Sequence, residues 1–272
     1  MSKFYNACGN KKRLSVIAGP CVFETQEHAL HMAGALSEIC QKHDVNFIYK
    51  TSFDKANRSR LDSFRSAGFD AAHYGMQAVR DRGIEVLTDI HEAWHADAVA
   101  ADILQIPAFL CRQTDLINAA VDSGKAVNIK KGQFLAPWDM VDVVRKVETR
   151  TKMMIAGRTM LMLTERGTTF GYNNLVVDMR SLAFMRSKVE MKAYPVIMDC
   201  SHAIQLPGVG TGEPEYIAPI ARAAVAVGIA GVFLEVHETP DTAPSDGPNM
   251  LALKDFEPLL EQLLEIDDVV KR

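Results

Sequence analysis

The sequence predicts an α/β fold, a single (β/α)8 TIM barrel that forms one catalytic domain over residues 1–272. Three observations lead to this prediction. Short apolar runs rich in β-forming residues alternate with longer helical stretches, the pattern of βαβ units around a parallel sheet. Eight such units fit into 272 residues, and this barrel typically takes about 250 residues. Nearly every predicted strand also ends in a chemically capable residue.

The predicted elements follow one another as strand and helix along the whole chain. Helices are expected over 25–42, 137–149, 214–227 and 254–269, and the last contains LLEQLLEI, whose apolar spacing is helical. Residues 171–174 (GYNN) are expected to start the helix after the sixth strand, with asparagine as its cap. The predicted strands are LSVIAGPC (14–21), VNFIYKTS (45–52), EVLTDI (85–90), ILQIP (103–107), AVNIKK (126–131), MLMLTER (160–166), PVIMDCSH (195–202) and GVFLEVHE (231–238).

Composition and charge argue against two broad classes of protein. The formal net charge is -4 and the pI is about 6.1, whereas a general nucleic-acid binder carries a basic surplus. No apolar run approaches the length of a membrane span, and the N-terminus lacks the apolar core of a signal peptide. The five scattered cysteines favour free thiols in a reduced, cytoplasmic protein. From the charge and the lack of an apolar span, we expect no nucleic-acid or membrane partner.

The ends of the predicted strands carry polar residues in all eight units. A barrel places its active site at the C-terminal ends of its strands, and polar side chains there are costly unless they are satisfied. Any one of them has an alternative role in capping a strand or bonding a loop, but eight together favour an active site. They are Cys21, Lys50, Asp89, Gln105, Lys131, Arg166, His202 and Glu235.

Cations gather at three of these strand ends or just after them. Segment 50–59, KTSFDKANRS, places three of them around Asn57 and Ser59. Concentrated at one mouth of an acidic protein, they would attract phosphorylated and carboxylated metabolites. The alternative for such a charge run is a solvated surface loop. The cations are Lys50, Lys55, Arg58, Lys131 and Arg166.

Four residues are candidate ligands of a divalent transition ion. Strand 8 pairs with strand 1 in a closed barrel, so residues that end strands 7, 8 and 1 are neighbours. A thiolate, an imidazole and two carboxylates suit such an ion. A buried cysteine that only packs, or a histidine that is only hydrogen-bonded, remains an alternative, and Cys200 is a further candidate beside His202. The four are Cys21, His202, Glu235 and Asp246.

Seven strings, in order along essentially the whole chain, resemble the 3-deoxy-D-manno-octulosonate 8-phosphate synthases. Related heptulosonate 7-phosphate synthases, which use erythrose 4-phosphate, carry Lys-Pro-Arg-Thr/Ser where this sequence reads KANRS (55–59). The strings are IAGPC (17–21), KTSFDKANRS (50–59), DILQIPAFLCRQTDL (102–116), NIKKGQF (128–134), LTERGTTFGYNNLVVDMR (163–180), DCSHAIQLPG (199–208) and SDGP (245–248).

The resemblance implies a cytoplasmic, usually tetrameric enzyme of lipopolysaccharide biosynthesis. It would join phosphoenolpyruvate to D-arabinose 5-phosphate and water, and release phosphate. By position in the family, Lys131 and Arg166 would hold the phosphate of phosphoenolpyruvate, with the Ala108 backbone nearby. Lys50 and Lys55 would lie near its carboxylate and reacting carbons. Asn57 and Asp89 would contact the hydroxyl groups of the sugar. Arg58, Ser59 and an Arg112 from a neighbouring subunit would bind the sugar phosphate.

The position of Cys21 divides this family. Members with cysteine there resemble the metal-dependent branch, whose other ligands match His202, Glu235 and Asp246, so we expect one ion of Zn, Fe, Mn or Co. The sequence departs from the family at residues 65–68, RSAG, where Arg-Gly-Pro-Gly is common, and in a longer 151–160 segment. Two rival functions remain, a synthase that uses erythrose 4-phosphate and a non-catalytic barrel that binds a phosphometabolite.

Overall fold

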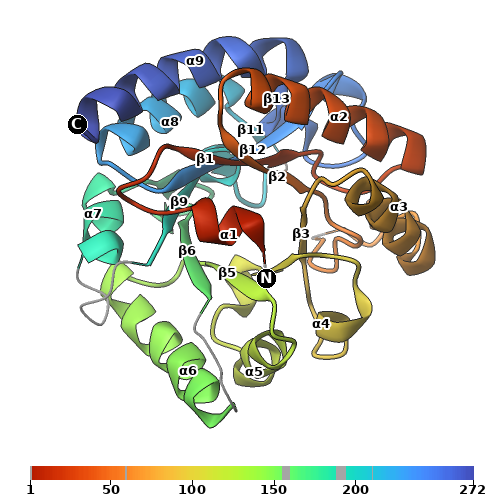
Figure 1. Ribbon diagram of the computed structural model, residues 1–272, viewed down its shortest axis with the longest axis horizontal. Helices are drawn as coiled ribbons and strands as arrows, with labels where there is room; N and C mark the ends of the chain where they lie inside the picture. The colour runs from red at the N-terminus through yellow and green to blue at the C-terminus, as the bar shows by residue number, and fades with distance from the viewer. Residues whose placement is uncertain (1, 59, 155–159, 188–193, 210) are drawn as a thin grey trace.

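Eight parallel strands close into a barrel in a computed structural model that describes residues 2–58, 60–154, 160–187, 194–209 and 211–272 (Figure 1). The last barrel strand, β12, pairs in parallel with both β9 and β1, which completes the ring. The predicted fold class is therefore confirmed. The barrel strands are β1 (Ser15–Gly19), β2 (Asn46–Lys50), β3 (Val86–Asp89), β4 (Ile103–Ile106), β5 (Ala126–Lys130), β6 (Leu161–Glu165), β9 (Val196–Asp199) and β12 (Gly231–His237).

Each barrel strand buries both of its faces, which explains why the strands read as continuous apolar runs. Their outward side chains pack under the helices, and their inward ones fill the barrel. A layer with one residue from every strand fills the N-terminal half of the interior, and Phe4 and Cys8 pack onto it from the region of α1 (Lys3–Ala7). The interior layer contains Ile17, Ile48, Leu87, Ile103, Ala126, Met162, Ile197 and Phe233.

The remaining helices surround the strands. The first, α2, begins after Thr25, whose hydroxyl accepts the His28 amide, so its expected start is confirmed. The helix after β3 is only one turn, α4 (His95–Ala98). The others are α2 (Gln26–Lys42), α3 (Phe69–Asp81), α5 (Thr114–Asp122), α6 (Met140–Met153), α7 (Met179–Ser187), α8 (Ile217–Ala226) and α9 (Leu253–Val270). Across the described ranges, none of the helices has the length and apolarity needed to cross a bilayer.

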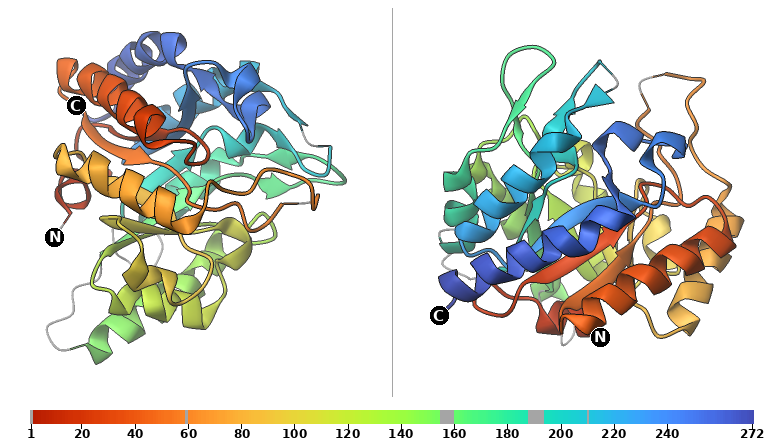
Figure 2. Two further views of the ribbon diagram at one scale, coloured as in Figure 1. Left: turned by 90° about the vertical axis from the view of Figure 1, so that its right-hand side faces the viewer. Right: turned by 90° about the horizontal axis from the view of Figure 1, so that it is seen from above.

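The loops after β2, β6 and β9 project from one end of the barrel, the C-terminal end of its strands (Figure 2). Two of them contain short hairpins, β7 (Thr168–Thr169) with β8 (Leu175–Val176), and β10 (Gln205–Leu206) with β11 (Thr211–Gly212). The expectation that 171–174 starts a helix is wrong, because these residues turn between β7 and β8. Gly171 and Asn173 have φ angles of 72° and 54°, outside the right-handed helical region.

The predicted strand 195–202 also ends earlier than expected. Strand β9 stops at Asp199, and His202 opens a short 3-10 turn, His202–Ile204. Cys200 is fully buried and its thiol lies 3.6 Å from the Met198 carbonyl oxygen, so Cys200 packs rather than pairs with His202.

Candidate active site

A cavity of about 740 Å³ lies at the C-terminal end of the barrel strands. This volume lies within the range of small-molecule sites, about 300–1,000 Å³. Its wall carries cations, amides and carboxylates from seven barrel strands or the loops after them. The predicted site residues that line it are Lys55, Asn57, Arg58, Asp89, Gln105, Ala108, Arg166, His202 and Asp246.

Three candidate metal ligands meet at Asp246, which lines this cavity. Cys21, Glu235 and Asp246 offer ligand atoms that all lie within 4.8 Å of one another. The Cys21 thiol donates to Asp246 Oδ2 at 3.1 Å, and His202 Nε2 lies 3.6 Å from Glu235 Oε1. The closure of β12 onto β1 brings this set together, because Gly19 and Glu235 are register partners.

The orientation of His202 suits a ligand. Its Nδ1 lies 2.8 Å from Asp199 Oδ2, and a ring that donates its Nδ1 proton to a carboxylate leaves Nε2 free to bind an ion. Glu235 Oε2 is buried and has no hydrogen-bond partner within the described part of the chain. This thiol, imidazole and carboxylate donor set therefore fits a divalent transition ion.

Two buried lysines neutralise the carboxylate at the bottom of the site. Lys50 Nζ donates to Glu235 Oε1 at 2.7 Å and to the Cys21 carbonyl at 3.0 Å, while Lys55 Nζ lies 3.9 Å from Glu235. Burial opposes ionisation of Glu235, but the charges of Lys50, His202 and Lys55 lower its pKa to about 2. Gly19 permits this arrangement, since a Cβ there would overlap the Lys50 carbonyl oxygen.

Arg58 reaches the metal-ligand cluster from the loop after β2. Its guanidinium lies 3.2 Å from Asp246 Oδ1 and also bonds the Ser245 hydroxyl. Burial acts against the charge of Asp246, but Lys55, His202 and Arg58 hold its pKa well below the usual range.

Two further cations of the cavity wall, Arg166 and Lys130, can receive an anion. Arg166 is 4% exposed; its Nη2 donates to Gln205 at 2.7 Å, and its buried Nη1 has no partner among the residues described. Lys130 Nζ lies over the Phe233 ring, 3.8 Å from the centroid, and 2.6 Å from Asp199 Oδ2. An unpartnered buried guanidinium N–H is costly, so its position favours a ligand there.

Asp89 is held by hydrogen bonds that cross four strands. Gln105 donates to Asp89, Asn128 donates to Gln105 at 2.9 Å, and Thr164 donates to Asn128 at 2.6 Å. Asp89 also accepts from the Ser52 hydroxyl at 2.6 Å. Burial acts against its charge, but Lys50, Lys55 and Lys130 lower its pKa, so Asp89 is an ionised acceptor facing the cavity.

A family model described as the DAHP synthetase I family matches residues 4–272. The chain belongs to the DAHP synthetase I family. Its relatives include proteins named 2-dehydro-3-deoxyphosphooctonate aldolase, another name for the octulosonate 8-phosphate synthases. One from Fusobacterium nucleatum is 52% identical over 270 residues, which cover 97% of this chain and 94% of the relative.

Two further relatives carry the same name. One from Rhodopseudomonas palustris (strain BisB5) is 54% identical over 271 residues, covering 97% of this chain and 91% of the relative. One from Cyanothece sp. is 48% identical over 265 residues, covering 95% and 93%. The family resemblance noted in the motifs is thereby confirmed, and the chain is an enzyme that forms carbon–carbon bonds.

The enzyme brings most, but not all, of the predicted site residues to the cavity. Lys131 lies outside it, because its buried ammonium bonds Thr168 Oγ1 at 3.0 Å and lies 3.3 Å from Glu165. Lys50 is also absent from the cavity lining, as are the metal-ligand candidates Cys21 and Glu235 that it contacts. The exposed Arg112 is absent from the lining, and Ser59 lies outside the described residues.

Lys130 lines the cavity although it was not among the predicted site residues. On β5, Val127 and Ile129 pack outward among the helices, whereas Ala126 belongs to the interior layer. Alternation along the strand therefore directs Asn128 and Lys130 inward. The period-2 pattern of AVNIKK was the available signal. Asp199, which orients His202, carried no comparable signal, because only the turn after β9 brings the two together.

The two departures from the family pattern have different outcomes. In segment 65–68, the Arg65 carbonyl accepts the Lys55 amide at 3.0 Å and its guanidinium pairs with Asp54, so this segment is anchored to the loop after β2. The 151–160 segment falls mainly on residues 155–159, which lie outside the described residues.

Proposed function

We propose that this enzyme condenses phosphoenolpyruvate with D-arabinose 5-phosphate and water to give 3-deoxy-D-manno-octulosonate 8-phosphate and phosphate. The observation that carries the proposal is one cavity that combines a buried anion site, at Arg166 and Lys130, with a cluster of metal ligands. The names of the relatives, about 50% identical over nearly their whole length, support the choice of the eight-carbon product.

The phosphate of phosphoenolpyruvate would bind at Arg166 and Lys130, beside the Ala108 backbone. The unpartnered Arg166 Nη1 supports this assignment, because a phosphate oxygen supplies the acceptor that it lacks. We assign to Lys130 the role predicted for Lys131, since Lys130 faces the cavity and Lys131 does not. Both cations are fixed before the substrate arrives, so they stabilise the departing phosphate without reorganising.

The sugar would lie toward the loop after β2. Asn57 and the ionised Asp89 line that side and suit hydroxyl groups, and Arg58 suits the sugar phosphate. Arg58 pairs with Asp246 in the free protein, and we propose that the sugar phosphate takes over the guanidinium on binding. Ser59 and an Arg112 from a neighbouring chain would complete this end.

A divalent ion of Zn, Fe, Mn or Co would be held by Cys21, His202, Glu235 and Asp246. Such an ion supplies a Lewis acid that can orient or polarise a carbonyl or lower the pKa of water. Burial raises the pKa of the Cys21 thiol, and the negative charge of Glu235 raises it further. The thiol is therefore protonated in the free protein, and cation binding must displace this proton. Asp199 would hold the His202 ring in the orientation that leaves Nε2 free.

The buried lysines would carry the charge changes at the reacting carbons. C3 of phosphoenolpyruvate bonds to the aldehyde C1, water adds at C2, and phosphate leaves with cleavage of its bond to C2. Lys55 Nζ, at the cavity wall, would donate to the aldehyde oxygen as negative charge develops there. Lys50 is paired with Glu235 and would keep that carboxylate ionised and in position.

We further propose that the enzyme acts as a cytoplasmic homotetramer. The exposed Arg112 lies just after Phe109, a cavity-lining residue whose side chain is 55% exposed, which supports an interface at this edge of the site. The five cysteines are buried and free, in keeping with a reducing compartment. Light scattering of the purified enzyme tests the subunit number.

The decisive experiment measures phosphate release from phosphoenolpyruvate with each of two sugars. We expect rapid phosphate release with arabinose 5-phosphate and little with erythrose 4-phosphate. With arabinose 5-phosphate, the mass of the product should equal that of the two substrates plus water minus phosphate. Equal specificity constants would favour the heptulosonate synthase reaction instead. Metal content is determined on the same preparation, before and after chelation.

A further inference from the structure

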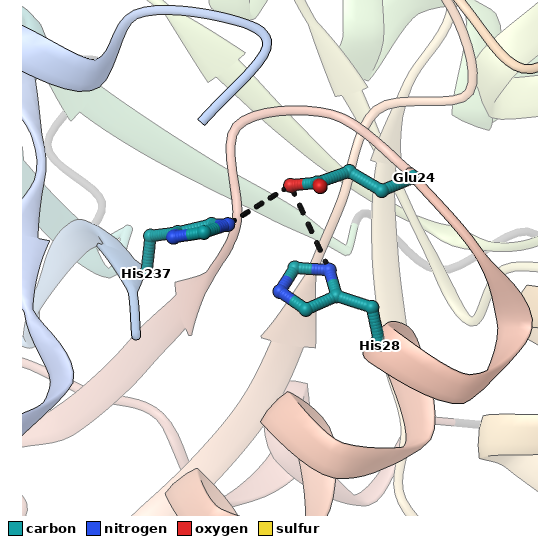
Figure 3. A group of neighbouring side chains, drawn as sticks. All are labelled: Glu24, His28 and His237. Carbon is teal, nitrogen blue, oxygen red and sulfur yellow. Dashed lines mark hydrogen bonds and ion pairs between the residues drawn. The ribbon is translucent and has the colours of Figure 1, made fainter. Parts of the chain in front are cut away.

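A second group of possible metal ligands lies outside the cavity. Glu24 is in the loop between β1 and α2, His28 is in the first turn of α2, and His237 is the last residue of β12. Figure 3 shows the two rings directed toward the Glu24 carboxylate. None of the three residues lines the cavity.

The spacing of the three ligand atoms is that of an ion-binding site. Glu24 Oε1 lies 3.0 Å from His237 Nε2 and 3.7 Å from His28 Nδ1, and all three atoms lie within 4.8 Å of one another. Two ligands held about 2.1 Å from a tetrahedral ion are about 3.4 Å apart. The observed separations lie on either side of this value, so small side-chain rotations suffice.

His28 supplies an independent sign of a missing partner. Both of its ring nitrogens are buried, and neither has a hydrogen-bond partner in the ranges that the structure describes. The 3.7 Å gap to Glu24 is too long for a hydrogen bond. Burial lowers the pKa of His28, so its ring is the neutral form that binds metals. Buried polar atoms are otherwise satisfied in most proteins.

One hydrogen bond to His237 weakens the binding of an ion at this site. The Thr239 amide donates to His237 Nδ1 at 2.9 Å, which places the ring proton on Nε2, where it faces Glu24. An ion at Nε2 displaces this proton to Nδ1 and releases the Thr239 amide. Because Thr239 is exposed, water can accept from that amide, but the site binds less tightly than one with an acceptor behind the histidine.

We propose that Glu24, His28 and His237 form a second site for a divalent transition ion, with Zn²⁺ the best match and water as the fourth ligand. Two imidazoles and one carboxylate are a common zinc ligand set. The ion ties the loop that follows β1 to the end of β12. These two elements also carry Cys21 and Glu235, so the second ion braces the ligands of the first site.

Cobalt binding distinguishes the two sites by spectroscopy. Co²⁺ held by a cysteine thiolate gives a sulfur-to-metal charge-transfer band, and Co²⁺ held by histidine and glutamate does not. We expect two Co²⁺ per wild-type chain and one in His28→Leu, with the charge-transfer band unchanged in that variant. In Cys21→Ser we expect the band to vanish while the ion that depends on His28 remains.

Matched variants control for folding and for nonspecific histidines. His31→Leu removes a histidine from the same helix; its Nε2 lies 3.2 Å from Glu238, and both ions should be retained. Glu24→Gln keeps the side-chain shape. Like His28→Leu, it should lower the affinity for the second ion about 100-fold or more, a larger effect than the loss of a residue that only contacts a metal ligand. Circular dichroism verifies that each variant is folded.

Two results would overturn the second site. One is an unchanged Co²⁺ count in both His28→Leu and Glu24→Gln, and the other is an equal loss in His31→Leu. If the wild type lacks the charge-transfer band but keeps the His28-dependent ion, the metal proposed at Cys21 fails and the second site stands.

Discussion

Replacing Arg166 by alanine separates the phosphoenolpyruvate end of the cavity from the sugar end. The guanidinium is buried, keeps one hydrogen bond to Gln205, and leaves Nη1 without a partner among the described residues. A cation held in this way contributes little to folding, because its desolvation is not repaid in the free protein. Its contribution is expected when a phosphate binds.

The size of the effect follows from the hydrogen bonds that are lost. A hydrogen bond to a charged group contributes about 1.5–3 kcal/mol, and about 1.4 kcal/mol corresponds to a tenfold change. We therefore expect kcat/KM for phosphoenolpyruvate to fall about 10- to 150-fold in Arg166→Ala. The KM for arabinose 5-phosphate and the melting temperature should change little. Arg58→Ala should show the mirror image, a raised KM for the sugar phosphate.

Lys131→Met is the matched control, since it removes a buried cation that does not face the cavity. Lys131 and Glu165 are 3.3 Å apart and at most 1% exposed, and breaking such a buried pair costs about 3–5 kcal/mol of stability. We expect a lower melting temperature and a nearly unchanged KM for phosphoenolpyruvate. Steady-state phosphate release with each substrate varied in turn, together with thermal melts, measures both effects.

The assignment of the phosphate pockets is refuted by either of two results. In the first, Arg166→Ala raises the KM for arabinose 5-phosphate alone. In the second, Lys131→Met weakens phosphoenolpyruvate use as much as Arg166→Ala does, which would return the phosphate site to Lys131.

Three further predictions follow. Erythrose 4-phosphate should have a kcat/KM at least about tenfold below that of arabinose 5-phosphate, because each of Asn57 and Asp89 left unpaired costs about 1–3 kcal/mol; equal values contradict this. Chelation should abolish activity, and added Mn²⁺, Fe²⁺, Zn²⁺ or Co²⁺ should restore it. The variant Cys21→Asn should keep some turnover that chelators do not remove. Full activity in metal-free wild type would show that Cys21 serves only in packing. Glu235 has a pKa of about 2, below its ordinary 4.5, so the stability it contributes is complete above pH 4.5 and is lost as pH falls toward 2; acid unfolding should be flatter in Glu235→Gln.

Strand alternation explains why Lys130, and not the predicted Lys131, lines the cavity at the end of β5. The end of that strand reads Ile129, Lys130, Lys131, and the choice of the last residue rested on family position. The inward direction of Lys130 follows from the period of two that begins at Ala126. The signal was local and present in the sequence. Lys131 turned out to be a structural cation, bonded to the loop after β6.

Other parts of the site had no local signal. Asp199 bonds His202 only because β9 ends early and the chain turns back, and the Asp89–Gln105–Asn128–Thr164 chain depends on the register of four strands. His237 lies more than 200 residues along the chain from Glu24 and His28, and meets them only because β12 lies beside β1. Such contacts depend on closure of the barrel, which short-range patterns do not specify.

The sequence by itself determined the eight strands, their order, the family and most of the residues that face the cavity. It could do so because apolar periodicity is local and because a barrel collects the ends of all its strands at one mouth. Only the tertiary structure decided which lysine of the pair enters that mouth, which carboxylate orients His202, and which histidines meet Glu24. Those outcomes depend on side-chain direction and strand register, which are set when the ring closes and each strand is held between two neighbours.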